Sequence, residues 1–354
     1  MPALFSPLAI RGVTFRNRIA VSPMCEYSSV DGFANDWHLV HLGSRAVGGA
    51  GLVMTEATAV EARGRISPAD LGIYCDAHVE MLARIARFIS EQGAVPGIQI
   101  AHAGRKASTR VPWEGGAAIP ESDGGWQTVA PSPIPFREGE RVPTELTRSE
   151  IQGIVEAFAT AARRAFAAGF QVVEIHGAHG YLMSEFLSPL ANHRTDEYGG
   201  SLAGRMRFAL EVAAAVRGVW APHLPLFMRI SCTDWVEGGW QIEDSVELAR
   251  RLQPLGIDLV DCSSGGVVSY ARVPVGPAYQ TPFAERIRRE TGVLTGAVGM
   301  ITEARQADEI VGSGRADVVL LARELLRDPY WPLHAAKELG VPGPVPKQYG
   351  RAFA

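Results

Sequence analysis

A repeated alternation between short apolar runs and helical patterns constrains the fold of this chain most strongly. The apolar runs occupy residues 19–22, 51–56, 95–101, 171–176, 225–231, 258–263, 293–298 and 317–322. Their nearly continuous apolar character is typical of strands that are covered on both faces, as in a parallel sheet. Eight such units predict an α/β fold of the (β/α)8 TIM-barrel type, and an open doubly wound sheet is the alternative.

The segments between these runs carry helix signals. Thr147 and Glu150 form a capping-box pattern before apolar residues at helical spacing, so a helix is expected to begin there. Thr281, which precedes a proline, and Thr302 are further candidates for helix N-caps. Three glycines fall near expected helix ends, where a left-handed residue is favoured. They are Gly169, Gly256 and Gly292.

The chain is expected to form one domain over residues 1–354, because no linker, tandem repeat or low-complexity segment divides it. One connection is unusually long: residues 104–147 follow the third run as an insertion. Loops of this length inside a compact domain are usually functional. We therefore predict a lid over the strand-end face, and a decorative insertion is the alternative.

Charge and cysteine content limit the class of protein. The chain has 34 basic and 38 acidic residues, a net charge of −4, which argues against nucleic acid or an anionic membrane as the main partner. The four cysteines are far apart in sequence, which predicts neither a zinc or iron–sulfur cluster nor a disulfide scaffold. The N-terminus lacks signal-peptide features, and no apolar run reaches about 18 residues. A cytoplasmic protein is the simplest interpretation.

Barrel enzymes place their chemistry at the C-terminal ends of the strands. The residues there are Ser22, Pro23, Met24, Cys25 and Tyr27 after the first run, Glu56 and Ala57 at the second, Gln99 and His102 at the third, His176, His179 and Tyr181 at the fourth, Arg229 in the fifth, Gly299 after the seventh, and Ala322 and Arg323 after the eighth. Arg229 is informative, because a cation in an apolar strand is costly unless it meets an anion or a strong acceptor. A salt bridge to a nearby carboxylate is the alternative to a ligand contact.

The remaining polar residues allow several interpretations. Gly299 and Arg323 follow the seventh and eighth runs, which is the usual phosphate site of barrels. His176 and His179 could ligate a metal, but no third ligand is adjacent in sequence; they could be structural, or they could donate to a substrate oxygen beside Tyr181. Cys25 has no neighbouring base and is more consistent with a buried or cofactor-facing thiol than with a nucleophile.

Several long motifs together resemble the Old Yellow Enzyme family of flavin-dependent ene-reductases. They are SPMCEYS, GLVMTEATAV, IQIAHAGRKA, EIHGAHGYLMSEFLSPLANHRTDEYGGS and LLARELLRDPYW, and the match covers nearly the whole chain. Cys25 within SPMC is similar to the thermophilic-like, xenobiotic-reductase branch. The resemblance implies a TIM barrel that binds FMN non-covalently, is reduced by NADPH or NADH, and forms a homodimer or homotetramer.

The resemblance also implies residue roles. It assigns the isoalloxazine contacts to Ser22, Pro23, Met24, Cys25, Ala57 and Gln99, the flavin N1–C2 edge to Arg229, the phosphate to Gly299, Ala322 and Arg323, the substrate oxygen to His176 and His179, proton donation to Tyr181, and further substrate contact to Tyr27. Many relatives have glycine where this chain has Ala322. In this branch a C-terminal residue often reaches the neighbouring subunit's site, and Arg351 is the candidate.

The activity implied is that of an NADPH dehydrogenase or ene-reductase. It would reduce the C=C bond of α,β-unsaturated carbonyl or nitro compounds by ping-pong hydride transfer through flavin N5, since no GxGxxG fingerprint provides a separate nicotinamide module. A flavin barrel acting mainly on nitro or xenobiotic substrates and a metal-dependent barrel hydrolase are alternatives. So are a Schiff-base aldolase using Lys106 and a non-catalytic flavin-binding protein.

Overall fold

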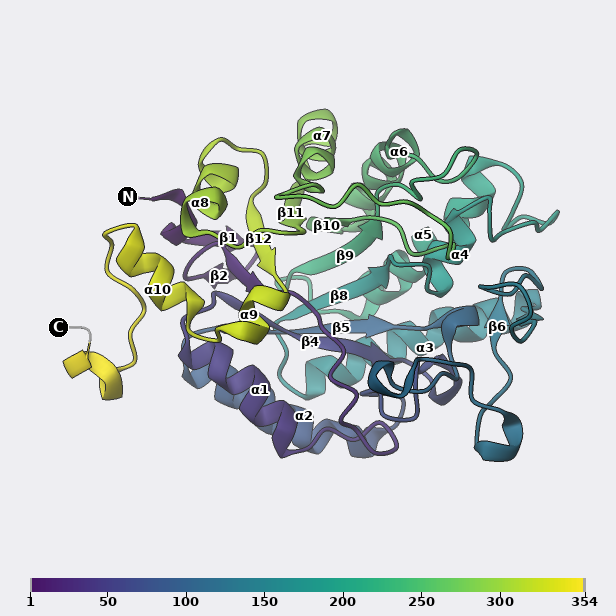
Figure 1. The fold of residues 1–354 in the computed structure, drawn as a ribbon, viewed down its shortest axis with the longest axis horizontal. Coiled ribbons are helices and arrows are strands. Elements are labelled where there is room, and N and C mark those ends of the chain that lie inside the picture. Colours follow the sequence, from purple (N-terminus) through teal and green to yellow (C-terminus); the bar gives the residue numbers. More distant parts are fainter. Residues whose placement is uncertain (1, 353–354) are drawn as a thin grey trace.

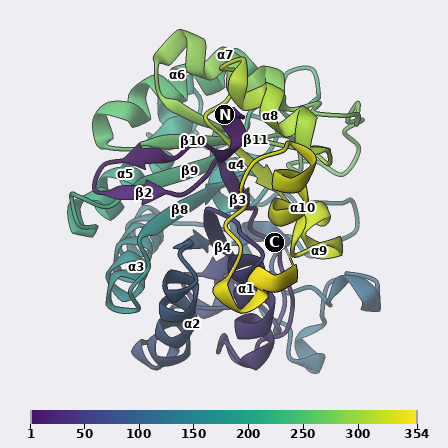
Figure 2. The ribbon, with the colours of Figure 1, turned by 90° about the vertical axis from the view of Figure 1, so that its left-hand side faces the viewer.

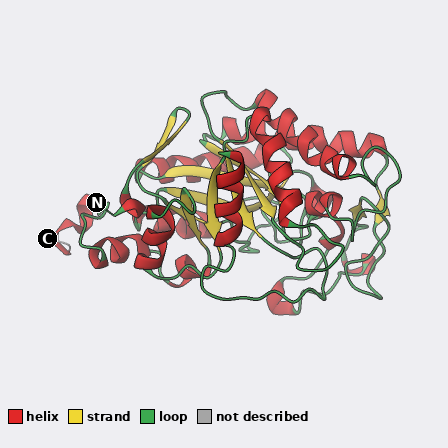
Figure 3. Ribbon diagram, turned by 90° about the horizontal axis from the view of Figure 1, so that it is seen from above, coloured by secondary structure: helices red, strands yellow, loops and turns green. Residues whose placement is uncertain are grey.

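The computed structural model describes residues 2–352, which form a closed barrel of parallel strands surrounded by helices (Figure 1; Figure 3). Around the barrel the strand order is β3, β4, β5, β8, β9, β10, β11 and β12, and β12 pairs with β3 to close the ring. The strands span Ile19–Val21 (β3), Leu52–Ala59 (β4), Val95–Ala101 (β5), Val172–Gly177 (β8), Leu226–Ser231 (β9), Leu259–Ser263 (β10), Leu294–Val298 (β11) and Val318–Leu321 (β12). The predicted (β/α)8 barrel is confirmed, and each of the eight apolar runs predicted from the sequence forms one of its strands.

The helices cover the outside of the ring, and their apolar faces pack against the strands. They span Asp36–Val47 (α1), Val79–Glu91 (α2), Arg148–Ala167 (α3), Leu182–Leu187 (α4), Leu202–Val219 (α5), Ile242–Leu252 (α6), Thr281–Thr291 (α7), Ala304–Gly312 (α8), Arg323–Arg327 (α9) and Trp331–Glu338 (α10). Within residues 2–352, no helix combines the length and the apolarity needed to cross a bilayer.

Helix boundaries test the capping predictions. Thr147 caps α3 through a complete capping box with Glu150, as predicted. The N-cap predictions for Thr281 and Thr302 are wrong. Thr281 is the first residue of α7, and Gln280 precedes it as the N-cap. The carbonyl of Thr302 instead accepts a hydrogen bond from Trp331 Nε1 at 2.9 Å, and α8 begins two residues later. The three predicted glycines do adopt positive φ, between +76° and +90°.

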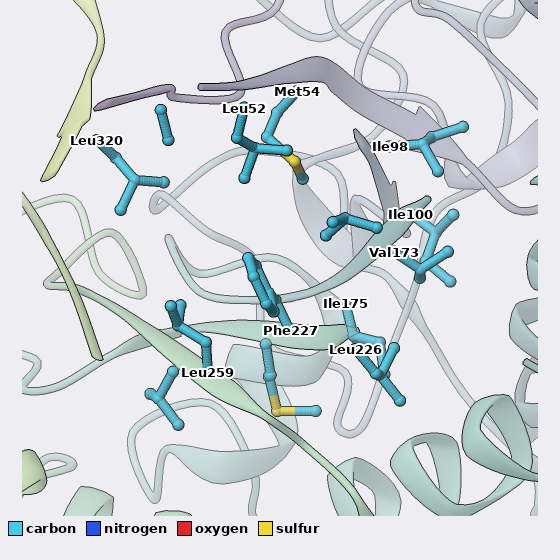
Figure 4. Packing of buried hydrophobic residues seen from close by; sticks show 14 of the residues in the cluster. Leu52, Met54, Ile98, Ile100, Val173, Ile175, Leu226, Phe227, Leu259 and Leu320 are labelled. Atoms are coloured by element: carbon cyan, nitrogen blue, oxygen red, sulfur yellow. The ribbon is translucent and has the colours of Figure 1, made fainter. Parts of the chain in front are cut away.

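Side chains inside the barrel change character along its axis. Phe227 of β9 lies among apolar residues of other barrel strands, including Leu52 and Met54 of β4 and Leu259 of β10 (Figure 4). Residues two apart in a strand point to the same face. Arg229 and Ser231 therefore follow Phe227 on its side of β9, toward the C-terminal end. The barrel interior is filled by apolar side chains at one end. Polar side chains line the other end, at the C-terminal ends of the strands, which we call the barrel mouth.

Segments outside the repeating units lie at opposite ends of the barrel. An N-terminal hairpin of β1 (Leu8–Ile10) and β2 (Val13–Phe15) closes the apolar end, where the Phe15 and Phe227 rings are 6.3 Å apart. The insertion 104–147 includes the short strands β6 (Val129–Ala130) and β7 (Thr144–Glu145) and lies far from both chain termini (Figure 1). Figure 2 faces the opposite side, where α10 and the C-terminal segment lie.

Candidate functional site

Arg229 is the centre of a buried ionic network at the polar mouth. Its Nε donates to Asp261, its Nη2 donates to Ser22 Oγ at 2.7 Å, and Glu174 lies 3.9 Å from Nε. Gln99 Nε2 donates to Glu174 Oε1 at 2.8 Å. The network therefore brings together the predicted residues Ser22, Gln99 and Arg229. The salt bridge that the sequence offered as the alternative for Arg229 is present.

Glu174 and Asp261 are the members of this network that the site prediction missed. Strand register places them beside the predicted residues, because Gln99 pairs with Glu174 and Arg229 pairs with both His176 and Asp261. Both carboxylates are fully buried. Burial, reinforced by the charge of Asp261, raises the pKa of Glu174 to about 8. One oxygen of each carboxylate has no hydrogen-bond partner among the described residues.

The turn after β8 brings His176, His179 and Tyr181 together. The His176 ring lies 5.1 Å from the His179 ring and 5.3 Å from the Tyr181 ring, both edge-on. His179 has a φ of +62°, which is uncommon for a residue with a side chain. Its backbone N–H donates to Ser231 Oγ at 2.8 Å, so the end of β9 supports this turn. The sequence predicted that these three side chains lie close together, and the structure confirms this.

Burial determines the protonation of these three side chains. Burial, with the charge of Arg229 among the lesser causes, lowers the pKa of His176 well below its usual value and that of His179 to about 3. Burial raises the pKa of the Tyr181 hydroxyl well above its usual value. At neutral pH the site therefore holds two neutral imidazoles and a protonated phenol. His179 Nε2 lies 2.7 Å from Ser263 Oγ, which leaves Nδ1 available to a ligand.

Lys106, at the start of the insertion, is fastened beside this cluster. Its Nζ donates to the carbonyl oxygens of His179 at 2.8 Å and Gly266 at 3.2 Å. It also lies 4.8 Å from the centre of the Tyr181 ring, as a cation–π contact. An amine held by two carbonyls over an aromatic ring is a brace between the β8 turn and the β10 loop. This arrangement disfavours the Schiff-base alternative.

The loop after β3 presents Cys25 and Tyr27. The Tyr27 ring packs edge-on at 5.8 Å against Trp113 of the insertion. Burial, then the charges of Asp70 and Glu56, raises the pKa of the Cys25 thiol well above its usual value. Cys25 is thus a thiol rather than a thiolate, consistent with the argument against a nucleophile.

A separate cavity, with about 540 Å³ of empty space, lies where β11 and β12 end. Gly299, Ala322 and Arg323 all line it, together with Met300. Gly299 has a φ of +113°, and a Cβ there would lie 2.7 Å from Gln280 Nε2, so glycine is required. Ala322 has a φ of −102°, outside the left-handed region, so its backbone does not demand the glycine of many relatives.

The other predicted residues are more peripheral. Pro23 and Met24 are half-buried in the loop after β3, and Ala57 of β4 pairs in register with Gln99. Arg351 is exposed on a short 3-10 helix, Lys347–Ala352, and does not line that cavity. Within residues 2–352, no three histidine, cysteine or acidic side chains converge as metal ligands.

Sequence comparisons place this architecture among known proteins. The family model described as the NADH:flavin oxidoreductase / NADH oxidase family matches residues 3–341. An NADPH dehydrogenase of Geobacillus sp. (strain WCH70) is 53% identical over 352 residues, covering 99% of this chain and 98% of that protein. An NADPH dehydrogenase of Bacillus subtilis (strain 168) is 47% identical, covering 99% of each.

Solved structures share the fold at lower identity. Morphinone reductase in complex with tetrahydroNAD is 27% identical with a TM-score of 0.79, covering 97% of this chain and 92% of that one. The old yellow enzyme homologue from Zymomonas mobilis is 25% identical with a TM-score of 0.80, covering 97% and 94%. A 2-naphthoyl-CoA reductase is 26% identical with a TM-score of 0.85, and the match spans 52% of its longer chain.

Proposed function

Because this chain belongs to the NADH:flavin oxidoreductase / NADH oxidase family, and specifically to its Old Yellow Enzyme group, we propose that it is an ene-reductase. As an FMN-dependent NADPH dehydrogenase it would use NAD(P)H to reduce activated alkenes, meaning α,β-unsaturated carbonyl or nitro compounds, in a ping-pong cycle. The observation that carries this proposal is the cluster of two neutral imidazoles and one protonated phenol, held next to a buried guanidinium at the barrel mouth.

The residues at the mouth fit FMN. Arg229 is positively charged beside Ser22 and Gln99, as an electron-rich ring would require. The cavity at Gly299 and Arg323 combines a glycine that cannot carry a Cβ with an exposed guanidinium. Gly299, Ala322 and Arg323 would hold the phosphate. Pro23, Met24, Cys25 and Ala57 would complete the ring contacts. Bound there, FMN supplies the two-electron carrier between nicotinamide and alkene.

His176 and His179 would bind the activating oxygen of the alkene. Each neutral imidazole offers one N–H, and a buried donor stabilises the negative charge that develops on a carbonyl or nitro oxygen during reduction. Removing one such donor typically raises the barrier by about 3 kcal/mol. Both rings are oriented by the protein before substrate arrives: His179 by Ser231 and Ser263, and His176 by its contacts with His179 and Tyr181.

Tyr181 would deliver the proton to the carbon next to the activating group. Its hydroxyl keeps its proton because burial raises its pKa, and its ring is fixed between His176 and Lys106. We expect Tyr181→Phe to slow alkene reduction while leaving reduction of bound FMN by NADPH unchanged. Stopped-flow absorbance separates the two half-reactions. Full alkene-reduction rate in a variant with normal flavin reduction would remove Tyr181 from this role.

Arg351 would complete the site of a neighbouring subunit. It is exposed in the single chain, and its segment lies past the last long helix, so it is free to contact a second copy. Together with Tyr27, it would contact substrate in a homodimer or homotetramer. Truncation after Pro346 should raise the Michaelis constant for the alkene without changing FMN content. An unchanged Michaelis constant in the truncated oligomer would count against this assignment.

A further inference from the structure

A cavity lined mostly by residues of the insertion is not used by the proposed flavin contacts. It contains about 640 Å³ of empty space, and its walls include Ile66, Phe136 and Tyr181. Ile66 and Tyr181 also line the small pocket beside Ala57 at the barrel mouth. The cavity is therefore the outward continuation of the place where substrate would lie.

The polar lining of this cavity is strongly biased toward positive charge. Four cations line it, whereas the carboxylate in its wall is Glu140 alone among the described residues. The cations are Arg105, Lys106, Arg137 and Arg141. Arg137 pairs with Glu140 at 3.1 Å, and the side chains of the other three donate only to carbonyl or hydroxyl oxygens among the described residues. Their charge has no matching anion in the wall.

Two of the cations have unused hydrogen-bonding capacity. Arg105 is 7% exposed, and its Nε is buried without a hydrogen-bond partner among residues 2–352. Lys106 has three donor hydrogens and two carbonyl acceptors. Buried cations without counter-ions are costly, and a bound anion removes that cost.

Glu185 is the nearest acid behind these cations, but it does not neutralise them. Burial raises its pKa to about 8, against the opposing charge of Arg105, so it is largely protonated at neutral pH. Burial and the neighbouring arginines lower the pKa of Lys106 to about 8, against the opposing charge of Glu185. Burial is the main cause of both shifts, because it disfavours the charged form of each side chain.

We propose that this cavity is a subsite for the anionic group of a ligand whose reactive end lies at Tyr181. The inference rests on the proposed function for the position of that reactive end. A phosphate or carboxylate satisfies the arginine and lysine donors. Two sources share this chemistry: the phosphates of NAD(P)H, and an acidic group on the alkene itself.

The test uses the oxidised holoenzyme, in which ligands bind without turnover. Calorimetric titrations compare NADP+ with nicotinamide riboside, which has the ring but no phosphate, and 4-carboxycinnamaldehyde with cinnamaldehyde. Arg137→Gln removes an exposed cation of the cavity, and Glu140→Gln removes its carboxylate. Arg110→Gln is the matched control, because Arg110 lies on the same insertion in an equivalent 3.2 Å pair with Asp123 but lines no part of the cavity.

Arg137→Gln should weaken binding of the anionic probe roughly two- to fivefold, Glu140→Gln should strengthen it by a similar factor, and Arg110→Gln should change nothing. The member of each pair that lacks the anionic group should not lose affinity in Arg137→Gln. An effect confined to NADP+ identifies nicotinamide phosphate as the source, and one confined to 4-carboxycinnamaldehyde identifies an acidic alkene. The subsite is refuted if Glu140→Gln fails to act oppositely to Arg137→Gln in both pairs, or if Arg110→Gln acts like Arg137→Gln. Failure of the proposed function is a separate result: no bleaching of the flavin by NADPH and no recovery with cyclohexenone.

Discussion

Two carboxylates surround Arg229, and we predict that their neutralisation has unequal consequences. Asp261 contacts the guanidinium directly, whereas Glu174 lies 3.9 Å from it and accepts from Gln99. Asp261→Asn leaves a buried cation without its charged partner, which typically costs about 3–5 kcal/mol. Glu174→Gln should cost about 1 kcal/mol or less at pH 7, since the carboxyl is already mostly protonated and glutamine can still accept from Gln99.

The same pair of variants predicts a pH effect with a definite sign. Folding raises the pKa of Glu174 to about 8, while an unfolded glutamate loses its proton near about pH 4.3. Between these values the folded state binds more protons, so the contribution of Glu174 to the free energy of unfolding falls as pH rises. The wild type should therefore lose stability from pH 6 to pH 8, and Glu174→Gln should lose less over the same interval.

Urea unfolding of the FMN-saturated proteins at pH 6, 7 and 8, followed by far-UV circular dichroism, measures these differences. Flavin fluorescence of the folded samples shows whether either variant releases FMN, which separates stability from cofactor loss. Equal losses of stability for the two variants at pH 7 would mean that Glu174 shares the negative charge with Asp261. A slope in Glu174→Gln as steep as in the wild type would reject the titration of Glu174 in this range.

Three further outcomes follow from local geometry. Gly299→Ala forces a Cβ to within 2.7 Å of Gln280 Nε2 at a φ of +113°, a strain of about 1–3 kcal/mol that should reduce FMN retention on ultrafiltration. Thr147→Ala breaks the α3 capping box and should lower the free energy of unfolding by about 0.5–2 kcal/mol in urea. Ser263→Ala removes the hydroxyl 2.7 Å from His179 Nε2; the alkene Michaelis constant should rise while flavin reduction is unchanged, and ¹⁵N NMR of labelled histidine should show the altered tautomer.

The barrel was predictable because each of its strands is buried on both faces. Such a strand is a continuous apolar run, and β9, for example, is buried at all six positions. The N-terminal hairpin gave no comparable signal, since β1 and β2 have three residues each and alternate buried with exposed positions. Its place in the fold depends on Phe15 meeting Phe227, a contact between residues more than two hundred positions apart.

The candidate site was only partly predictable, because some of its residues pair with partners on other strands that are distant in sequence. The sequence marked Arg229 as costly in an apolar strand, yet the same argument applied to Glu174 in VVEIH and Asp261 in DLVDCS would have identified its partners. Lys106 was marked only as a lysine near a strand end. Its role as a brace depends on two carbonyls, those of His179 and Gly266, that come from separate turns.

Those two turns hold the histidine–tyrosine cluster in a fixed arrangement. The chain after β8 crosses the chain after β10 backbone to backbone: a Cβ at Gly180 would lie 2.0 Å from the Gly266 carbonyl oxygen, and one at Gly266 would lie 2.5 Å from the His179 carbonyl. Lys106 fastens both segments from the side, and Ser231 holds the His179 amide from below. The positive φ of His179 persists because Gly266, Lys106 and Ser231 all oppose its relaxation. In the proposed reaction, little reorientation of the imidazoles would be needed when the substrate oxygen binds, so the free energy of binding could stabilise the developing charge.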